Sequence, residues 1–387
     1  MPQIRSLPFL RESPRIAIYA SDEGFGHIVR QEAVIRELLS RIPNARITVQ
    51  TNAKLPVMKE KFGDRLQYRD VFNNVLTAKT ADGSLDLEAT SEMFRQYESR
   101  AAEWIQRALD EGMDFDLCIS DFVPEAFELA RLLHRPSFGV AHFTWDWFFS
   151  LLYPADTKST KKMEEYIGLA TRIYFPPFTP QPLLERHSRV AKQVPFIIND
   201  FTPIAVTPNS MKKCLIMDNG TKTLCRLIES SVSTLATIPD ICFYLAVDSL
   251  SGYALEIVDG APNIVPVHGL RNMHSHIPKM DFILARGGFN TLTECLISKI
   301  PSMLVEEGGN PEVKENVRLA KEAGFASHFS TADFGPRIAD RVRFFVDDEY
   351  DGIKARLQAA DFPKTGPAEI CDDILKQVEA FYGSSPI

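Results

Sequence analysis

The stretch that decides the fold is Arg15–Arg41, RIAIYASDEGFGHIVRQEAVIRELLSR. Arg15–Ala20 is an apolar run typical of a buried strand, and Ser21–His27 is a glycine-bearing loop. Ile28–Arg41 carries apolar side chains at helical spacing: Ile28, Val34, Ile35, Leu38 and Leu39. A strand, a tight loop and a helix in this order predict parallel strands joined by crossover helices.

The same alternation continues after this unit. Residues 46–50 predict a strand, Leu87–Glu111 a long helix, Phe115–Ile119 a strand and Pro124–Leu133 a helix. Seven prolines between Tyr174 and Pro208 then predict a break in regular structure. We therefore expect a domain boundary near residue 200.

Beyond residue 200 the alternation restarts. Predicted strands are Lys213–Met217, Ile241–Val247, Ile264–Val267, Phe282–Ala285 and Ser302–Val305, and predicted helices are 222–236, Thr291–Ser298 and 366–382. The predicted fold class is α/β with two Rossmann-like domains, 1–200 and 201–387. We expect the last helix to pack back on the first domain.

Composition narrows the class of protein. The chain has 387 residues, is 45% hydrophobic and 24% charged, and carries a net charge of −8. These values predict a folded globular protein and disfavour a nucleic-acid partner. No apolar run is long enough to span a membrane, and the charged, proline-containing first residues do not favour a signal peptide. Six scattered cysteines are expected to be reduced core thiols, so the predicted location is cytoplasmic.

The first loop, Gly24-Phe25-Gly26-His27, opens a helix directly after a strand. Its amides and the helix N-terminus favour an anion or a polar substrate. Val29 stands where the dinucleotide fingerprint needs glycine, so a nicotinamide cofactor is disfavoured. The glycines alone are also compatible with a purely structural turn. His27 at the helix start is expected to be neutral and able to accept a proton.

Asp121 is expected at the end of another strand of the same sheet. Because strand ends converge in such folds, Asp121 could bond one ring nitrogen of His27 and fix its tautomer. The alternative interpretation is a cap for the helix that begins at Pro124. The two roles are compatible.

The second loop is the stretch Arg286–Glu294, RGGFNTLTE. Its glycines, with Asn290 and Thr291 beside a helix N-terminus, suit a phosphate, and Glu294 suits the hydroxyls of a ribose. The alternative is a capping pattern with no ligand. Arg286 is a candidate cation or a surface residue. The loop 218–221, DNGT, occupies the equivalent place after the domain's first strand.

These motifs resemble glycosyltransferases of the two-domain GT-B fold. The resemblance rests on G-x-G-H, on G-G-x-x-T-x-x-E and on an Asn316-containing helix after Pro301, and it spans nearly the whole chain. GFGHIVR and SDFVPEAFELARLLHRPSFGVAHFTWDWF are most similar to the glycosyltransferase-like part of plant L-arabinokinases. The MurG-type N-acetylglucosaminyltransferase and the nucleotide-sugar hydrolase of pseudaminate synthesis share parts of the pattern.

The resemblance implies two Rossmann-like domains facing a central cleft and a nucleotide-sugar donor, with UDP expected. It also implies inversion without a metal or a bound cofactor, and His27 as the catalytic base with Gly26 near a small-molecule acceptor. The backbone of Leu270 would face the uracil. The implied nucleotide contacts are Gly220, Thr221, Arg286, Gly288, Asn290, Thr291 and Glu294, and the donor-sugar contacts are Glu307, Asn310 and Glu312.

Two further motifs lie outside the nucleotide and glycine loops. Asp114-Phe115-Asp116 has the form D-x-D but precedes a strand, so it is expected to be structural rather than a metal site. In the aromatic run 142–149, Phe148 and Phe149 are expected in the core. Trp145 and Asp146 are expected to face the acceptor, with stacking by the indole and hydroxyl binding by the carboxylate.

The expected activity is therefore glycosyl transfer, and two alternatives stay open. A nucleotide-sugar hydrolase is one, because Gly24–Arg30, G-x-G-H-x-x-R, also resembles that enzyme. The other is a sugar-nucleotide-binding protein that has the fold without the chemistry.

Overall fold

The computed structural model describes residues 12–23, 26–73, 77–81, 83–199, 205, 210–217, 222–248, 250–306 and 309–383, with the side chains of 26–28 and 270–274 left out. The chain divides into two compact units. Unit 1 consists of Met1–Ala78, Asp86–Asn199 and Pro363–Ile387, and unit 2 of Lys79–Leu85 and Asp200–Phe362.

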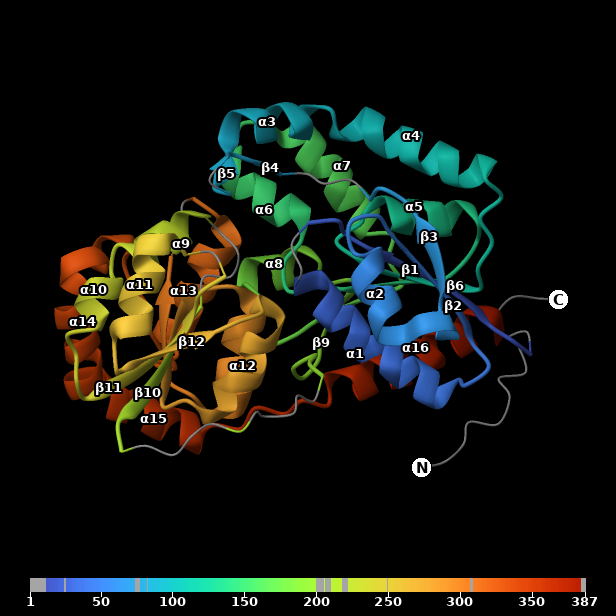
Figure 1. Cartoon of the computed structure of the whole chain (residues 1–387). Helices are drawn as coiled ribbons and strands as arrows, with labels where there is room; N and C mark the ends of the chain where they lie inside the picture. Colours follow the sequence, from blue (N-terminus) through green and yellow to red (C-terminus); the bar gives the residue numbers. More distant parts are fainter. Residues whose placement is uncertain are drawn as a thin grey trace. The chain divides into compact units, whose positions relative to one another are not determined.

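Unit 1 is built on a parallel sheet of seven strands in the order β3-β2-β1-β6-β7-β8-β9 (Figure 1). The strands are β1 (Arg15–Ala20), β2 (Arg46–Thr51), β3 (Gln67–Asp70), β6 (Leu117–Asp121), β7 (Ser137–Val140), β8 (Arg172–Phe175) and β9 (Ala191–Gln193). A parallel sheet needs cover on both faces, because both carry apolar side chains.

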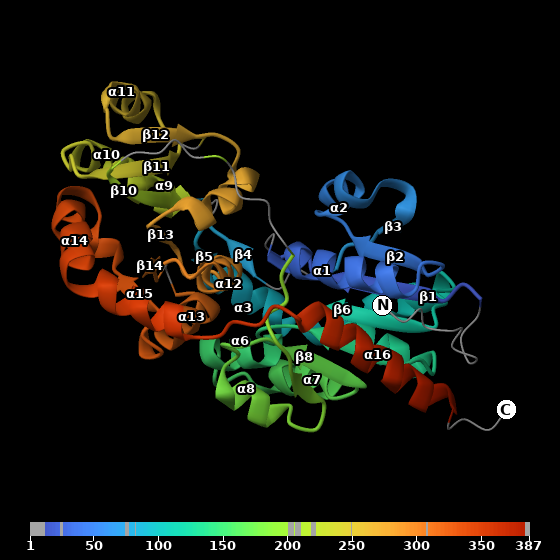
Figure 2. The same ribbon diagram turned by 90° about the horizontal axis from the view of Figure 1, so that it is seen from below.

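Helices supply that cover. They are α1 (Gly26–Arg41), α2 (Leu55–Phe62), α3 (Leu87–Arg95), α4 (Tyr97–Asp110), α5 (Glu125–Leu132), α6 (Trp145–Leu152), α7 (Thr157–Ile167), α8 (Gln181–Arg186) and α16 (Gly366–Gly383). One core packs α1, α2 and α16 against the sheet. The other core includes residues of α3 to α7. The last helix lies alongside α1 in both views, so the C-terminal segment belongs to unit 1 (Figure 2).

Unit 2 has a parallel sheet of six strands in the order β12-β11-β10-β13-β14-β15. They are β10 (Lys212–Met217), β11 (Ile241–Ala246), β12 (Ile264–Val267), β13 (Phe282–Arg286), β14 (Ser302–Val305) and β15 (Ala326–Phe329). Its helices are α9 (Lys222–Glu229), α10 (Val232–Leu235), α11 (Gly252–Gly260), α12 (Phe289–Ser298), α13 (Pro311–Glu322), α14 (Ile338–Phe344) and α15 (Tyr350–Ala359). Two short strands, β4 (Ala78–Lys79) and β5 (Leu85–Asp86), pair with each other in a separate two-stranded sheet.

In both sheets the strand order reverses beside the first strand. In unit 1 the reversal lies between β1 and β6, and in unit 2 between β10 and β13. Ligands of open parallel sheets bind outside the carboxyl ends of the strands at such a reversal. The loops after β1, β6 and β13 are therefore the places to look for a site.

Three expectations about regular structure were wrong. The predicted helix 222–236 is two helices, α9 and α10. The predicted helix Leu87–Glu111 is two helices, α3 and α4, which meet at Gln96. The proline-dense segment contains β8, α8 and β9, because its prolines fall at strand ends and at the start of α8, where a missing N–H costs little.

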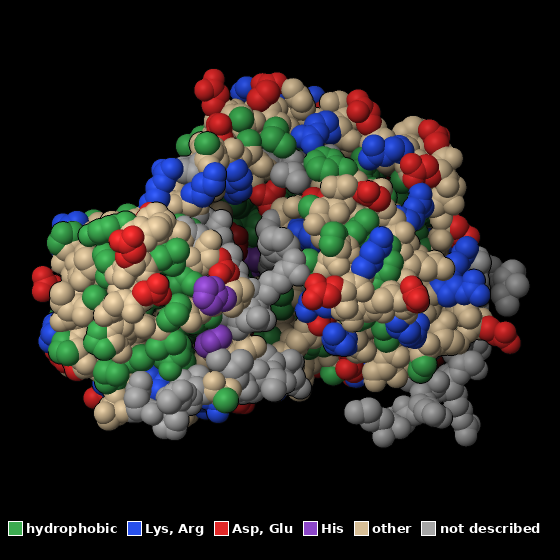
Figure 3. Space-filling model, in the orientation of Figure 1, with side chains coloured by type: hydrophobic (Ala, Val, Ile, Leu, Met, Phe, Trp, Pro, Cys, Tyr) green, Lys and Arg blue, Asp and Glu red, His purple; other side chains and the backbone are tan. Residues whose placement is uncertain are grey.

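Other features of composition are placed as follows. All six cysteines are buried and free, as predicted. No helix among the described residues is long and apolar enough to cross a membrane. On the face of unit 1 seen in Figure 3, basic and acidic side chains alternate over the surface rather than gathering by sign.

Gly287 illustrates how tightly unit 2 is packed beside its strand reversal. A Cβ atom at this position would lie 2.3 Å from Cγ2 of Val317 on α13. Gly288, its neighbour, has φ of −70°, and a Cβ there would meet no atom within 4 Å. The first glycine is therefore required by packing and the second is not.

We predict that Gly287→Ala lowers the free energy of unfolding by about 2 kcal/mol, because a methyl group must displace Val317. Gly288→Ala, the matched control, should cost under about 1 kcal/mol, the loss of a favourable helix cap. Urea unfolding followed by circular dichroism measures both. Equal destabilisation by the two variants would contradict the packing argument.

Candidate functional site

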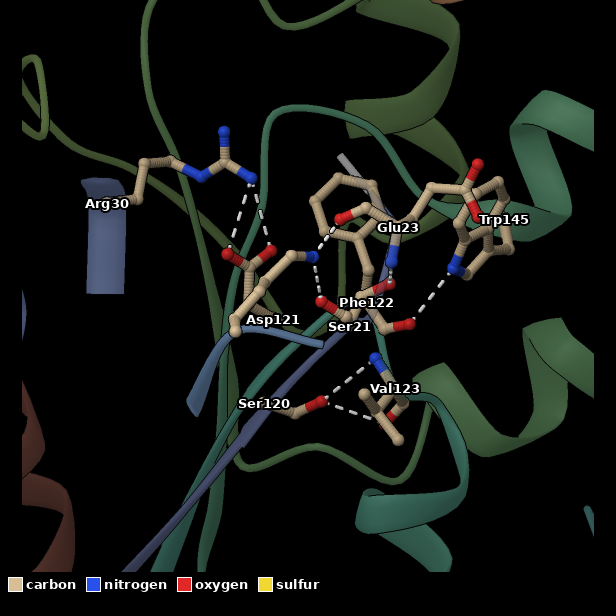
Figure 4. Close-up of polar contacts among 9 residues, drawn as sticks. Ser21, Glu23, Arg30, Ser120, Asp121, Phe122, Val123 and Trp145 are labelled. Atoms are coloured by element: carbon tan, nitrogen blue, oxygen red, sulfur yellow. Dashed lines mark hydrogen bonds and ion pairs between the residues drawn. The ribbon is translucent and has the colours of Figure 1, made fainter. Parts of the chain in front are cut away.

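The candidate site of unit 1 lies at the carboxyl ends of β1 and β6 (Figure 4). The backbone N–H of Ser21 donates to the carbonyl oxygen of Asp121 at 3.0 Å and joins the two strand ends. The glycine loop 24–27 follows at once. Since α1 begins at Gly26, the backbone of His27 lies in its first turn. The side chain of His27 lies outside the described part, and its pairing with Asp121 stays a prediction.

The carboxylate of Asp121 pairs with Arg30 of α1. One guanidinium nitrogen lies 3.1 Å from Oδ1 and 3.4 Å from Oδ2, and the two side chains are 0% and 2% exposed. A buried carboxylate is costly unless a partner compensates its charge. Arg30 follows His27 by three positions, so both lie on the same helix face. The sequence analysis missed this role, although Arg30 ends the G-x-G-H-x-x-R motif.

Asp121 does not cap the helix that follows it. The N-cap of α5 is Pro124, and no side chain caps it. The turn is held instead by the hydroxyl of Ser120, which donates to the carbonyl of Val123 at 2.8 Å and accepts from its N–H at 3.2 Å. The capping interpretation was wrong, because a carboxylate engaged by Arg30 points away from the helix.

Phe122, directly after Asp121, has a left-handed backbone with φ of 62°. This conformation is strained for a bulky residue, and such strain concentrates at functional sites. Two contacts hold it in place. Nε1 of Trp145 donates to the carbonyl of Phe122 at 2.9 Å, and the guanidinium of Arg30 lies 5.5 Å from the Phe122 ring centroid.

The backbone that precedes the glycine loop is fixed by side chains from elsewhere. Nζ of the buried Lys54 donates to the carbonyls of Ser21 and Glu23. Asp22 accepts from the hydroxyl of Thr51 at 2.6 Å and from two backbone amides of the same turn. Burial lowers the pKa of Lys54 to about 8, although neighbouring carboxylates oppose that shift. These hydrogen bonds therefore hold the backbone of residues 21–23, from which the glycine loop begins.

Trp145 and Asp146 are buried inside unit 1, so the structure gives no support to the expectation that they face an acceptor. Trp145 is 1% exposed and uses its N–H on Phe122. The buried Asp146 bonds Arg186 and His187, each at 3.0 Å. Burial opposes its ionisation, but these hydrogen bonds prevail and lower its pKa. Trp145 belongs to the core with Phe148 and Phe149, for which burial was predicted, and Asp146 is buried next to it in the chain.

In unit 2 the loop after β13 leads directly into α12. Arg286 ends the strand, and Gly288 is the N-cap of the helix without a side-chain cap. Asn290 and Thr291 lie in the first turn, and the buried Glu294 lies one turn further. The alternative interpretation, in which Asn290 or Thr291 caps the helix, is therefore wrong, because Gly288 occupies the cap position.

The next helix supports this loop. The side-chain amide of the buried Asn316 donates to the carbonyl of Gly287 at 3.1 Å. It also lies 3.5 Å from a carboxylate oxygen of Glu312. Asn310, a predicted donor-sugar contact, is the N-cap of α13 and accepts from the amide of Glu312 at 2.9 Å. Two of the predicted sugar contacts, Asn310 and Glu312, thus lie at the start of α13.

Several predicted contacts lie outside the described residues, namely Gly220, Thr221 and Glu307. Leu270 is described by its backbone alone, at the start of the 3₁₀ stretch Leu270–Lys279. The preceding Gly269 donates its N–H to Asp248 at 2.7 Å, which fixes the backbone beside Leu270.

The described residues contain no cluster of three or more His, Cys, Asp or Glu side chains that could hold a metal ion. The D-x-D motif lies at the other end of the sheet. Asp116 accepts the backbone N–H of Arg15 at 2.8 Å, and Asp114 pairs with the Arg15 side chain. The motif therefore joins the beginnings of β1 and β6.

Comparisons with known proteins agree with this arrangement at the level of the fold. No protein-family model and no curated protein matches the sequence. The calicheamicin glycosyltransferase CalG4 aligns over 97% of this chain and 100% of its own, with 17% identity and a TM-score of 0.70.

Two further structures illustrate the range of these similarities. Acinetobacter baumannii MurG covers 94% of this chain and 99% of its own, with 12% identity and a TM-score of 0.59. Phytolacca americana UGT2, in complex with UDP-2-fluoro-glucose and pterostilbene, covers 93% and 99%, with 14% identity and a TM-score of 0.63. The chain therefore has the GT-B fold, with one Rossmann-like sheet in each unit, as the sequence analysis predicted.

We predict that Asp121→Asn destabilises unit 1 by about 3 kcal/mol, because the buried Arg30 loses the carboxylate that it pairs with. Asp114→Asn, which removes a partly exposed ion pair, should cost under about 1 kcal/mol. All three tryptophans lie in unit 1, so urea unfolding followed by their fluorescence reports on this unit. A small loss for Asp121→Asn would refute the proposed importance of the pair.

Proposed function

We propose that the protein is an inverting glycosyltransferase that moves a sugar from a nucleotide sugar, with UDP as the expected carrier, to an acceptor hydroxyl. The observation that carries this proposal is Gly288 at the start of α12. Neither its φ nor the space around it requires glycine. Close approach of a phosphate to the backbone would require it, and helix N-termini bind phosphates in this way.

The donor site that we propose lies in unit 2. The first turn of α12, with Asn290 and Thr291, offers donors to the diphosphate, and Arg286 adds a positive charge. Glu294 would accept from the ribose hydroxyls. Gly220, Thr221 and the backbone of Leu270 complete the proposed nucleotide contacts. The bound UDP sugar in Phytolacca americana UGT2 supports the choice of UDP as the first nucleotide to test.

The sugar itself would meet the residues around the start of α13. Asn310 and Glu312 lie there in the structure, and Glu307 precedes them in the sequence. Side-chain oxygens of this kind accept hydrogen bonds from sugar hydroxyls. Their arrangement would choose among sugars, whereas the diphosphate contacts would be the same for all of them.

His27 is the proposed base, with Gly26 beside the acceptor. At the N-terminus of α1 the helix dipole disfavours a charged imidazole, so the ring can accept a proton. His27 would take the proton of the acceptor hydroxyl while the oxygen of that hydroxyl forms a bond to the anomeric carbon of the sugar. The bond from that carbon to the diphosphate breaks, and attack from the opposite side inverts the configuration. The start of α12 and Arg286 would stabilise the departing charge.

A nucleotide-sugar hydrolase is the second candidate function. It is favoured by the motif Gly24–Arg30, in which Arg30 pairs with the buried Asp121. In that reaction water replaces the acceptor hydroxyl, and the donor contacts are unchanged. Release of free sugar at full rate without any acceptor would favour hydrolysis over transfer.

The first prediction of this proposal concerns nucleotide binding. Calorimetric titration with UDP, GDP, dTDP, ADP and CMP, each with and without EDTA, should give selective binding of UDP that EDTA does not change. Glu294→Gln should weaken that binding about tenfold, because a charged hydrogen bond to the ribose is lost. Glu315→Gln, which removes a surface partner of Arg318, should leave it unchanged. Failure of all five nucleotides to bind would refute the donor site.

The second prediction separates the base from the donor site. His27→Ala should reduce turnover of the bound nucleotide sugar by about 10²- to 10⁴-fold and leave the nucleotide dissociation constant unchanged. Nucleotide release measured with a panel of acceptors gives the rate. His134→Asn, at an exposed left-handed position that asparagine tolerates, is the matched control. Undiminished turnover in His27→Ala would rule out the proposed base.

A further inference from the structure

A second pocket lies in unit 1, on the face of the sheet that α4 covers. Its volume is about 430 Å³, and it is bounded by the ends of β2 and β3 and by the second half of α4. The residues that matter for its chemistry are Gln50, Arg69, Phe72, Trp104, Arg107 and Glu111. None of them takes part in the proposed glycosyl transfer.

The wall of this pocket contains two buried donors that have no partner. Nε2 of Gln50 and Nε1 of Trp104 make no hydrogen bond, although their residues are only 2% and 3% exposed. Such groups are rare in folded proteins and cost free energy. Both donate and neither Nε1 nor Nε2 accepts, so the missing partner carries acceptor oxygens.

Tyr19 does not line the pocket but lies beside these two donors. It pairs with Gln50 across β1 and β2, and its ring centroid lies 5.3 Å from that of Trp104. Its hydroxyl is also buried without a partner. Burial raises the pKa of Tyr19 well above its ordinary value, so the hydroxyl keeps its proton. Three unpartnered polar groups therefore lie together on one face of the sheet.

The charged side chains that line the pocket indicate which charge a ligand can carry. Arg69 pairs with Glu111 at 2.6 Å, and Asp70 accepts from the side chain of Asn52 at 2.6 Å. Arg107 has no ion-pair partner among the described residues. The amide of Asn52 leaves the negative charge of Asp70 in place, so the two arginines and two carboxylates of the lining balance. Arg107 is the cation that can face an anionic group, and the carboxylate of Asp70 disfavours a ligand with two negative charges.

The mouth of the pocket has an apolar side. Phe72 is 49% exposed, and Val71, Ala108 and Met113 also line the space. An exposed phenyl ring offers contact area to an apolar or aromatic body. The lining therefore combines donors for one anionic head with a hydrophobic surface for the rest of the molecule.

We propose that this pocket binds a small monocarboxylate. Its oxygens accept hydrogen bonds from Trp104 Nε1 and Gln50 Nε2, its charge faces Arg107, and its apolar body packs on Phe72. The inference is independent of the proposed transferase activity, because it uses no residue of the donor site or of the glycine loop.

The test uses the indole N–H signals of the full-length protein in ¹H–¹⁵N NMR spectra. The chain has three tryptophans, and Trp104→Phe assigns the signal of Trp104. Sodium benzoate should shift that signal in a saturable manner. The signal of Trp145 should not move, because its N–H is already bonded to Phe122. Arg107→Gln should weaken benzoate binding about tenfold, as expected for loss of a charged partner.

The controls decide between this ligand class and others. Arg95→Gln, at an exposed arginine that pairs with Glu92 on α3, should leave benzoate binding unchanged. Benzamide has the same shape without the charge and should not saturate the signal. Equal binding of benzamide, or a response to inorganic phosphate alone, would overturn the monocarboxylate assignment. Absence of any saturable shift with benzoate would overturn the site itself.

Discussion

The parallel pairing of β1 with β6 is the constraint on which the rest of unit 1 depends. The register places Ala20 opposite Asp121, and the bond from Ser21 to Asp121 extends the pairing by one residue. The two strand ends therefore stop at the same level. The glycine loop and the strained turn at Phe122 leave from one point as a result. Without that common end, Arg30 on α1 would not meet the carboxylate at the end of β6.

The aromatic cluster after β7 stabilises the turn at Phe122, next to the end of β6. A left-handed Phe122 and a buried ion pair both raise the free energy of the folded state, and well-packed surroundings must offset that cost. Trp145 does so by donating to the Phe122 carbonyl while its ring packs with Phe149. Trp145, which was expected to touch an acceptor, thus stabilises the backbone of Phe122.

How much the sequence could predict depends on how local each signal is. The observed bounds of β1, β12 and β14 are the predicted ones. Short apolar runs between turn residues can be located from the local sequence alone. The break at Gln96 carries no proline or glycine, so periodicity alone could not locate it. The burial of Trp145 and the pairing of Arg30 with Asp121 depend on residues that lie far away in the chain. Local pattern carries no signal for either.

A buried polar group that has its hydrogen-bond partner inside the fold has a structural role, whereas a buried polar group without a partner is a candidate for ligand binding. Trp145 and Trp104 are both buried, but the first has its acceptor in Phe122 and the second has none. Gly287 and Gly288 form a similar pair, since packing against Val317 requires the first, whereas only a modest helix-cap preference favours the second. Features that the fold itself explains tell us how the chain is held together. Features that the fold does not require, such as Gly288 and the free Trp104 N–H, are the ones on which the two proposed ligand sites rest.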